Sequence, residues 1–150
     1  MSLRAEAHRP SPEGRLLELE IPSDIGCIER VVEAVRHECE QVQFSERLVA
    51  LNVRVALAEA LSNAILRGNR ERDDAFVRVR AQVDATMIVL EVADEGVGFD
   101  LDACTVDPTA PERLDAEDGR GLFLMRRLMH RVERFDVQGR SVIRMTLFRE

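Results

Sequence analysis

Three polar residues spaced four apart, Glu59, Asn63 and Arg67, are the part of this sequence best suited to chemistry. On a helix this spacing puts them in one row, while apolar neighbours such as Leu57 and Leu61 face elsewhere. A carboxylate can accept a proton, an amide oxygen can bind a hard cation, and a guanidinium can hold a negative group. Phosphoryl transfer requires these groups from a protein. The competing interpretation is a partly exposed polar edge of an apolar helix.

A glycine-containing segment follows a strand that the sequence predicts from Thr86 to Ala93. The strand leads directly to Asp94, and the glycines Gly96 and Gly98 then let the backbone turn tightly and approach a ligand. Residues 101–118 contain prolines and many acids without a clear period. We interpret them as part of a lid at about residues 100–120, with a disordered loop as the alternative.

A second glycine pair, Gly119 and Gly121, is predicted to open an amphipathic helix that runs to about Val132. The free N–H groups and the positive dipole end at such a start form a site for phosphate. An ordinary glycine turn before a helix is the alternative. The sequence contains no G-x-x-x-x-G-K-[ST] motif, which excludes a P-loop.

The remaining elements follow from hydrophobic periodicity and from capping residues. Strands are predicted at 15–21, 75–83, 86–93, 132–137 and 141–148, and helices at about 25–42 and from a cap at Ser45 to a stop at Gly68 and Asn69. Asp84 and Ala85 are predicted to join two of the strands. This order predicts an α+β fold, a two-layer sandwich with a mixed, mostly antiparallel sheet and three helices on one face.

Composition limits the possible functions. At 150 residues and 17.0 kDa, the chain is predicted to form a flexible tail at 1–14 and one domain at 15–150. A net charge of -7 and a pI near 5.1 argue against binding to nucleic acid. We expect no membrane partner, because no apolar run approaches a membrane span and the N-terminus lacks a secretory h-region. Three cysteines without CxxC spacing favour reduced thiols in the cytoplasm.

Three motifs together resemble a known superfamily. Glu59-x-x-x-Asn63, Asp94-x-Gly96-x-Gly98 and Gly119-x-Gly121 resemble the N, G1 and G2 boxes of the GHKL, or Bergerat-fold, ATPases, which include gyrase, heat-shock chaperone 90, histidine kinases and mismatch-repair ATPases. Glu-Ala-Leu-Ser-Asn-Ala and Gly-Arg-Gly-Leu-Phe-Leu-Met-Arg resemble the anti-sigma factor serine/threonine protein kinases of bacteria. The likeness covers about residues 15–148.

The resemblance implies a role for each matching residue. Asn63 would supply an oxygen to Mg2+, and Glu59 would accept the proton of an attacking serine hydroxyl. Asp94 would accept a hydrogen bond from the adenine amino group. The remaining ATP contacts would come from Gly96 and Gly98 around the base, and from Gly119, Gly121 and the N–H groups that follow, starting at Leu122, around the phosphates. We expect Arg67 and Arg120 to touch phosphates, with surface ion pairs as the alternative; many relatives have His where Arg67 stands.

The resemblance also implies partners. Histidine kinases usually carry Asn or His where Glu59 stands, and gyrase-like members carry Asp where Ser62 stands, which favours transfer to a protein hydroxyl. The implied function is a cytoplasmic kinase that phosphorylates an antagonist protein and sequesters a sigma factor, with a homodimer as the expected assembly. The alternatives are a catalytically weak ATP-binding partner-switch module and the separate ATP-binding half of a histidine kinase.

Overall fold

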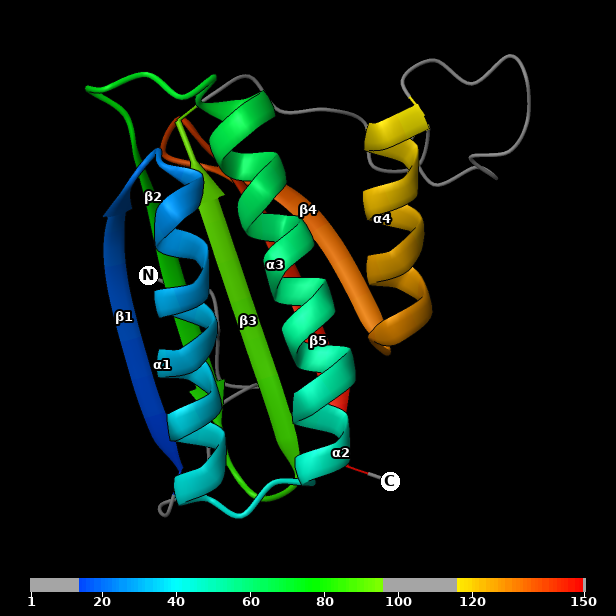
Figure 1. The fold of residues 1–150 in the computed structure, drawn as a ribbon. Coiled ribbons are helices and arrows are strands. Elements are labelled where there is room, and N and C mark those ends of the chain that lie inside the picture. Colours follow the sequence, from blue (N-terminus) through cyan, green and yellow to red (C-terminus); the bar gives the residue numbers. More distant parts are fainter. Residues whose placement is uncertain (1–13, 96–115, 150) are drawn as a thin grey trace.

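The described residues form five strands in one sheet, in the order β1-β2-β3-β5-β4; β1 and β2 alternate exposed with more buried residues, whereas β3 and β5 are more continuously buried (Figure 1). A computed structural model of the chain describes residues 14–95 and 116–149. The strands are β1 Arg15–Pro22, β2 Phe76–Val83, β3 Met87–Asp94, β4 Arg131–Val137 and β5 Arg140–Phe148. The α+β fold class is therefore confirmed. Every neighbouring pair of described strands is antiparallel, whereas the sequence predicted a mixed, mostly antiparallel sheet.

Two tight turns set the strand register. The Asp84 carboxylate accepts hydrogen bonds from the Thr86 N–H and hydroxyl, both at 2.8 Å, and from the Met87 N–H at 2.9 Å, which confirms the predicted turn between β2 and β3. Gln138 and Gly139 join β4 to β5 with φ values of 52° and 81°. Positive φ at both central residues is the conformation that two-residue hairpins favour.

One continuous helical stretch from Glu46 to Gly68 lies at the centre of the helical layer. It consists of α2 Glu46–Leu48, η3 Val49–Val53, α3 Arg54–Ser62 and η4 Asn63–Gly68, of which η3 and η4 are π-helical. The Ser45 hydroxyl accepts from the Leu48 N–H at 3.4 Å, as predicted for an N-cap. By length and composition these 23 residues could cross a membrane, but 50% of the most apolar window is buried within the fold, as in the core helix of a globular protein.

The first helix, α1 Ile28–Gln41, follows a short 3-10 turn, η2 Ile25–Cys27. The Asp24 carboxylate caps this turn by accepting from the Gly26 N–H at 2.9 Å. In Figure 1, α1, α3 and α4 lie on the same face of the sheet, as the sequence predicted, and no described helix covers the other face.

The last helix, α4 Ala116–Leu128, differs from its prediction at both ends. It begins three residues before Gly119, so Gly119 and Gly121 lie inside the helix and not in a turn before it. Leu122 and Met125 are buried in the core, and this packing favours a helix that continues across Gly121. The helix ends before Val132 because the chain pairs with β5 from Arg131 onward.

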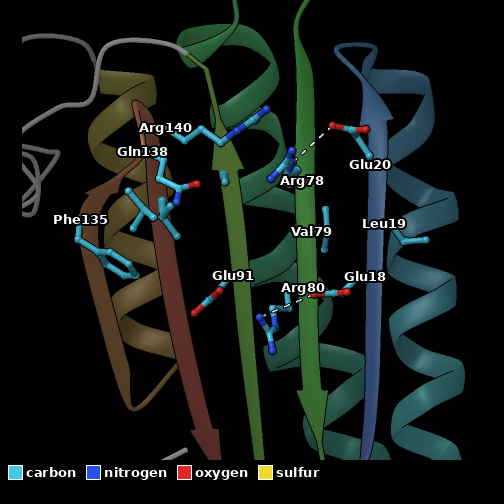
Figure 2. Close-up of a pocket in the computed structure, with 13 residues that line it drawn as sticks. Glu18, Leu19, Glu20, Arg78, Val79, Arg80, Glu91, Phe135, Gln138 and Arg140 are labelled. Atoms are coloured by element: carbon cyan, nitrogen blue, oxygen red, sulfur yellow. Dashed lines mark hydrogen bonds and ion pairs between the residues drawn. The ribbon is translucent and has the colours of Figure 1, made fainter. Parts of the chain in front are cut away.

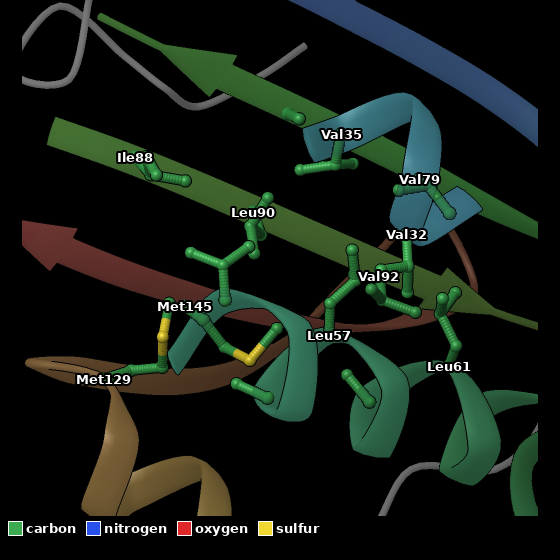
Figure 3. Packing of buried hydrophobic residues seen from close by; sticks show 14 of the residues in the cluster. Val32, Val35, Leu57, Leu61, Val79, Ile88, Leu90, Val92, Met129 and Met145 are labelled. Atoms are coloured by element: carbon green, nitrogen blue, oxygen red, sulfur yellow. The ribbon is translucent and has the colours of Figure 1, made fainter. Parts of the chain in front are cut away.

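The core lies between the helices and the sheet (Figure 3). Leu57 and Leu61 of α3 belong to the same buried cluster as Leu90 of β3 and Met145 of β5, and all four side chains are 0% exposed. Complete burial of such a side chain is worth about 1.5–3 kcal/mol, so α3 is held firmly on the sheet. This packing fixes the rotation of α3 and turns its polar row away from the sheet.

Candidate functional site

The polar row of the middle helix faces α4. A Cβ atom added to Gly121 of α4 would lie 2.9 Å from the Glu59 Oε1 and 3.5 Å from the Asn63 Nδ2. A side chain at this position would displace the Glu59 carboxylate oxygen and would lie in van der Waals contact with the Asn63 amide. Gly121 therefore lets the α4 backbone approach the carboxylate and the amide directly.

A cavity of about 260 Å³ lies at this contact, lined by Glu59, Ser62, Asn63, Leu66, Arg67, Arg120, Gly121 and Leu124. It joins a carboxylate, an amide and two guanidinium groups within one concave site. Five of the predicted site residues therefore meet in space, although they come from two helices far apart in the sequence. Leu122, also a predicted site residue, does not line this cavity. Its side chain is 1% exposed and packs in the core.

The π-helical turn η4 changes the register of the middle helix just after Asn63. The Asn69 N–H donates to the Ala64 carbonyl at 2.8 Å, which is the i to i+5 spacing of a π-helix. Such turns occur frequently at functional sites. Here the widened turn keeps Arg67 at the cavity and places Gly68 against the end of β3.

Asp94 ends β3 and is 8% exposed. A Cβ on Gly68 would collide with the Asp94 carboxylate and would lie 2.7 Å from its Oδ1. The carboxylate therefore packs on the backbone of Gly68, the residue after Arg67. Asp94 is not a lining residue of the 260 Å³ cavity and connects to it through this contact.

Gly68 is a site residue that the sequence analysis missed. The sequence pattern indicated only the stop of the middle helix at Gly68, and the structure shows the additional constraint from Asp94. In the sequence, only the position of Gly68 directly after Arg67 indicated that it could lie at the site. Gly96 and Gly98 lie outside the residues that the structure describes, as do residues 100–115 of the predicted lid. Gly119 lies in α4, and its surroundings are not described.

The described residues fit a nucleotide held with Mg2+. Within residues 14–95 and 116–149, no group of three or more His, Cys, Asp or Glu side chains could hold a metal ion alone. Mg2+ is usually bound through one or two protein oxygens together with substrate phosphates, which suits a site with few acids. Asn63 and Glu59 offer such oxygens, and Arg67 and Arg120 offer positive charge for phosphates.

A larger cavity of about 540 Å³ lies on the sheet face without helices (Figure 2). Its charges are arranged as cross-strand pairs, with Arg78 at 3.5 Å from Glu20 and Arg80 at 3.7 Å from Glu18. Paired charges on an open face are typical of a solvated or protein-binding surface. The smaller cavity is the candidate site, because there the Glu59 carboxylate, the Asn63 amide and the Gly121 backbone meet.

Comparisons with known proteins found a matching family and similar sequences. The histidine kinase-like ATPase domain family matches residues 21–147. An anti-sigma F factor of Clostridium beijerinckii is 30% identical over 83 residues, which cover 55% of this chain and 58% of that protein. The serine-protein kinase RsbW of Bacillus subtilis is 35% identical over 86 residues, which cover 54% of each chain. The chain thus matches little more than half the length of these relatives.

Solved structures show the same fold at low identity. The RsbU and RsbW domains of Rv1364c from Mycobacterium tuberculosis match 90% of this chain and 32% of that chain, with a TM-score of 0.60 and 14% identity. The histidine kinase domain of a blue-light activated histidine kinase from Erythrobacter litoralis matches 85% of this chain and 61% of that one, with a TM-score of 0.50 and 15% identity.

Proposed function

The chain belongs to the histidine kinase-like ATPase domain family, and we propose that it is an ATP-dependent serine/threonine protein kinase that also acts as an anti-sigma factor. One observation carries this proposal: Glu59 and Asn63 lie against the backbone of Gly121 at a cavity that also contains two arginines. The names of the relatives, anti-sigma F factor and serine-protein kinase RsbW, support the same function.

ATP would bind across the middle helix, with its base toward β3 and its phosphates toward α4. Asp94, packed on Gly68, would accept a hydrogen bond from the adenine amino group, and Gly96 and Gly98 would approach the base. Arg67 and Arg120 would contact the phosphates. Asn63 would hold Mg2+, which when bound neutralises charge on the phosphates.

Glu59 would act as the general base. The hydroxyl oxygen of a serine forms a bond to the γ-phosphorus, the bond from that phosphorus to the bridging oxygen of ADP breaks, and the hydroxyl proton passes to the Glu59 carboxylate. The Glu59 side chain is half-buried beside Asn63, so the proton acceptor and the cation ligand lie on one helix face. Rigid placement of both groups is the main contribution that a protein makes to this reaction.

The substrates and partners that we propose are an antagonist protein, whose serine accepts the phosphate, and a sigma factor, in a cytoplasmic setting. We also propose a homodimer through the sheet face without helices. This face carries exposed apolar side chains, including Leu16 and Phe76 at 51% and 39% exposure. Its larger cavity is lined by three acids and three arginines, so a second copy would meet complementary charges.

The test is a transfer assay with ATP, Mg2+ and the antagonist encoded by a neighbouring gene, with the phosphorylated residue mapped by mass spectrometry. Phosphoserine that disappears in Glu59→Gln, while ATP still binds, supports the kinase. Glu46→Gln is the matched control, since Glu46 begins the same helical stretch and lies outside the cavity. ATP binding without transfer would instead indicate a partner-switch module, and acid-labile phosphohistidine would indicate half of a histidine kinase.

A further inference from the structure

Asn69 is a fully buried polar residue that the proposed reaction does not use. It directly follows Gly68, at the end of the middle helix. Its Nδ2 donates to the Ser23 hydroxyl at 3.0 Å and to the Phe76 carbonyl at 3.1 Å, and its Oδ1 accepts from the Glu95 N–H at 2.7 Å. One amide therefore joins the middle helix to the end of β1, the start of β2 and the end of β3.

The groups around Asn69 are themselves held in place. The Ser23 hydroxyl donates to the Ala75 carbonyl at 2.6 Å, and the Phe76 N–H donates to the Glu95 Oε2 at 2.9 Å. Arg140 lies 3.7 Å from the same Glu95 oxygen. A buried network in which both amide donors and the acceptor are used is rigid, because breaking any bond leaves a buried group unsatisfied.

The network meets the site at Asp94. Glu95, whose N–H is fixed by Asn69, is the next residue after Asp94. On the other side, the Asp94 carboxylate packs on Gly68, the residue before Asn69. Asn69 is thus joined to both neighbours of the Asp94 carboxylate. It follows Gly68, on which the carboxylate packs, and it binds the N–H of Glu95, the residue after Asp94.

We propose that Asn69 is a positioning residue for recognition of the nucleotide base, acting on the Asp94 carboxylate through the Glu95 peptide. It fixes the carboxylate at the position where it accepts a hydrogen bond from the amino group of a 6-aminopurine. A 6-oxopurine presents a carbonyl at the same place, and a rigid carboxylate rejects it because two acceptors face each other. This inference rests on the proposed function of the same site.

The experiment compares the dissociation constants of ATP and inosine triphosphate, with Mg2+, by calorimetry. We expect Asn69→Leu to reduce the preference for ATP by about tenfold, about 1.4 kcal/mol, because the loosened β3 end lets the carboxylate move away from the carbonyl. The ratio is the informative quantity, since partial unfolding weakens both affinities by the same factor. Asn69→Ala, measured at low temperature, provides the same comparison if Asn69→Leu does not fold.

Ser23→Ala is the matched control, because it removes both hydrogen bonds of the Ser23 hydroxyl, from the Asn69 Nδ2 and to the Ala75 carbonyl, but leaves the bond from the Glu95 N–H to the Asn69 Oδ1. It should lower stability and keep the ratio of the two dissociation constants. If both Asn69 variants keep the wild-type ratio while Asp94→Asn loses it, Asn69 is only structural and the inference is wrong, although the proposed function stands. If the wild-type protein binds neither nucleotide, or binds both equally, the proposed base recognition fails and the inference fails with it.

Discussion

The backbone of Gly121 in α4 rests on the carboxylate of Glu59 in α3, so closely that a Cβ at Gly121 would lie 2.9 Å from the Glu59 Oε1. The contact joins two helices that are held elsewhere by apolar packing, with Leu122 and Met125 at 1% and 0% exposure. At its other end, α4 is held by Asn52, whose Nδ2 donates to the Leu128 carbonyl at 2.7 Å. The position of Glu59 therefore depends on how closely α4 approaches.

Gly121→Ala should separate stability from activity. In a helix interior, alanine is more favourable than glycine by about 1 kcal/mol. The atom that the new methyl group would displace is the Oε1 at the end of the half-buried Glu59 side chain. We expect the free energy of unfolding, measured in urea, to stay the same or to rise slightly. The rate of phosphate transfer should fall by about tenfold or more, because the general base is moved. An unchanged transfer rate would show that the position of Glu59 does not limit catalysis.

Gly68→Ala should be destabilising, in contrast. Its Cβ would collide with a carboxylate that is only 8% exposed, so the Asp94 side chain has little room to move. We expect a loss of about 1–3 kcal/mol in urea unfolding, together with weaker ATP binding. In an Asp94→Ala background, the same Gly68→Ala change should be neutral or stabilising. Equal costs in both backgrounds would contradict the collision.

The sequence was sufficient to predict the elements that depend on local pattern. The strands, the Ser45 cap and the Asp84 turn follow from periodicity and from side chains that bond their own backbone. The four-residue spacing of Glu59, Asn63 and Arg67 similarly predicted that they share one helix face. The roles that the resemblance gave these residues in catalysis and ATP binding remain predictions.

Tertiary contacts decided the features that the sequence could not predict. Gly119 and Gly121 are poor helix formers, yet α4 extends across them, because its buried residues pack on α3. The contact between Gly68 and Asp94 depends on a π-helical register that has no sequence signature. Asn69 looked like part of a helix stop, and its bonds to three other segments appear only after the chain has folded.

The proposed homodimer predicts different effects for two exposed leucines. Leu16 is 51% exposed on the sheet face, and Leu51 is 55% exposed on the helical layer. Sedimentation equilibrium of the wild-type protein should give about twice the chain mass of 17.0 kDa. Leu16→Asp should shift this mass toward the monomer, whereas Leu51→Asp should not. A wild-type monomer at high concentration would exclude the proposed dimer.

Two arginines on the sheet face should contribute unequally to stability. The Arg144 side chain is 11% exposed, lies 3.0 Å from Glu91 and 3.7 Å from Glu133, and stacks over Phe135. Arg144→Gln should cost about 1–3 kcal/mol, because it leaves a poorly exposed acid without its partner. Arg78→Gln, at a pair with 60% and 52% exposure, should cost less than about 0.5 kcal/mol. Similar losses in urea unfolding would refute this ranking.

Cys39 should make stability depend on pH in the alkaline range. Burial, with a smaller contribution from Glu38, raises the pKa of the Cys39 thiol from 9.0 to about 12. The unfolded chain releases this proton near pH 9, whereas the folded chain keeps it until about pH 12. The unfolded state therefore binds fewer protons in this window, and the free energy of unfolding falls by up to about 1.4 kcal/mol per pH unit as pH rises.

The composition makes this prediction easy to measure, because the chain has no Tyr and all 21 of its Lys and Arg residues are Arg. Only cysteines among the side chains titrate between pH 9 and pH 11. Urea unfolding with a reductant at pH 8, 9.5 and 10.5 should show a steep loss of stability in the wild-type protein and a flatter one in Cys39→Ala. Cys27→Ala, at a half-buried thiol, should retain the steep loss. Equal slopes in the wild-type and Cys39→Ala proteins would show that the buried thiol is not the group responsible.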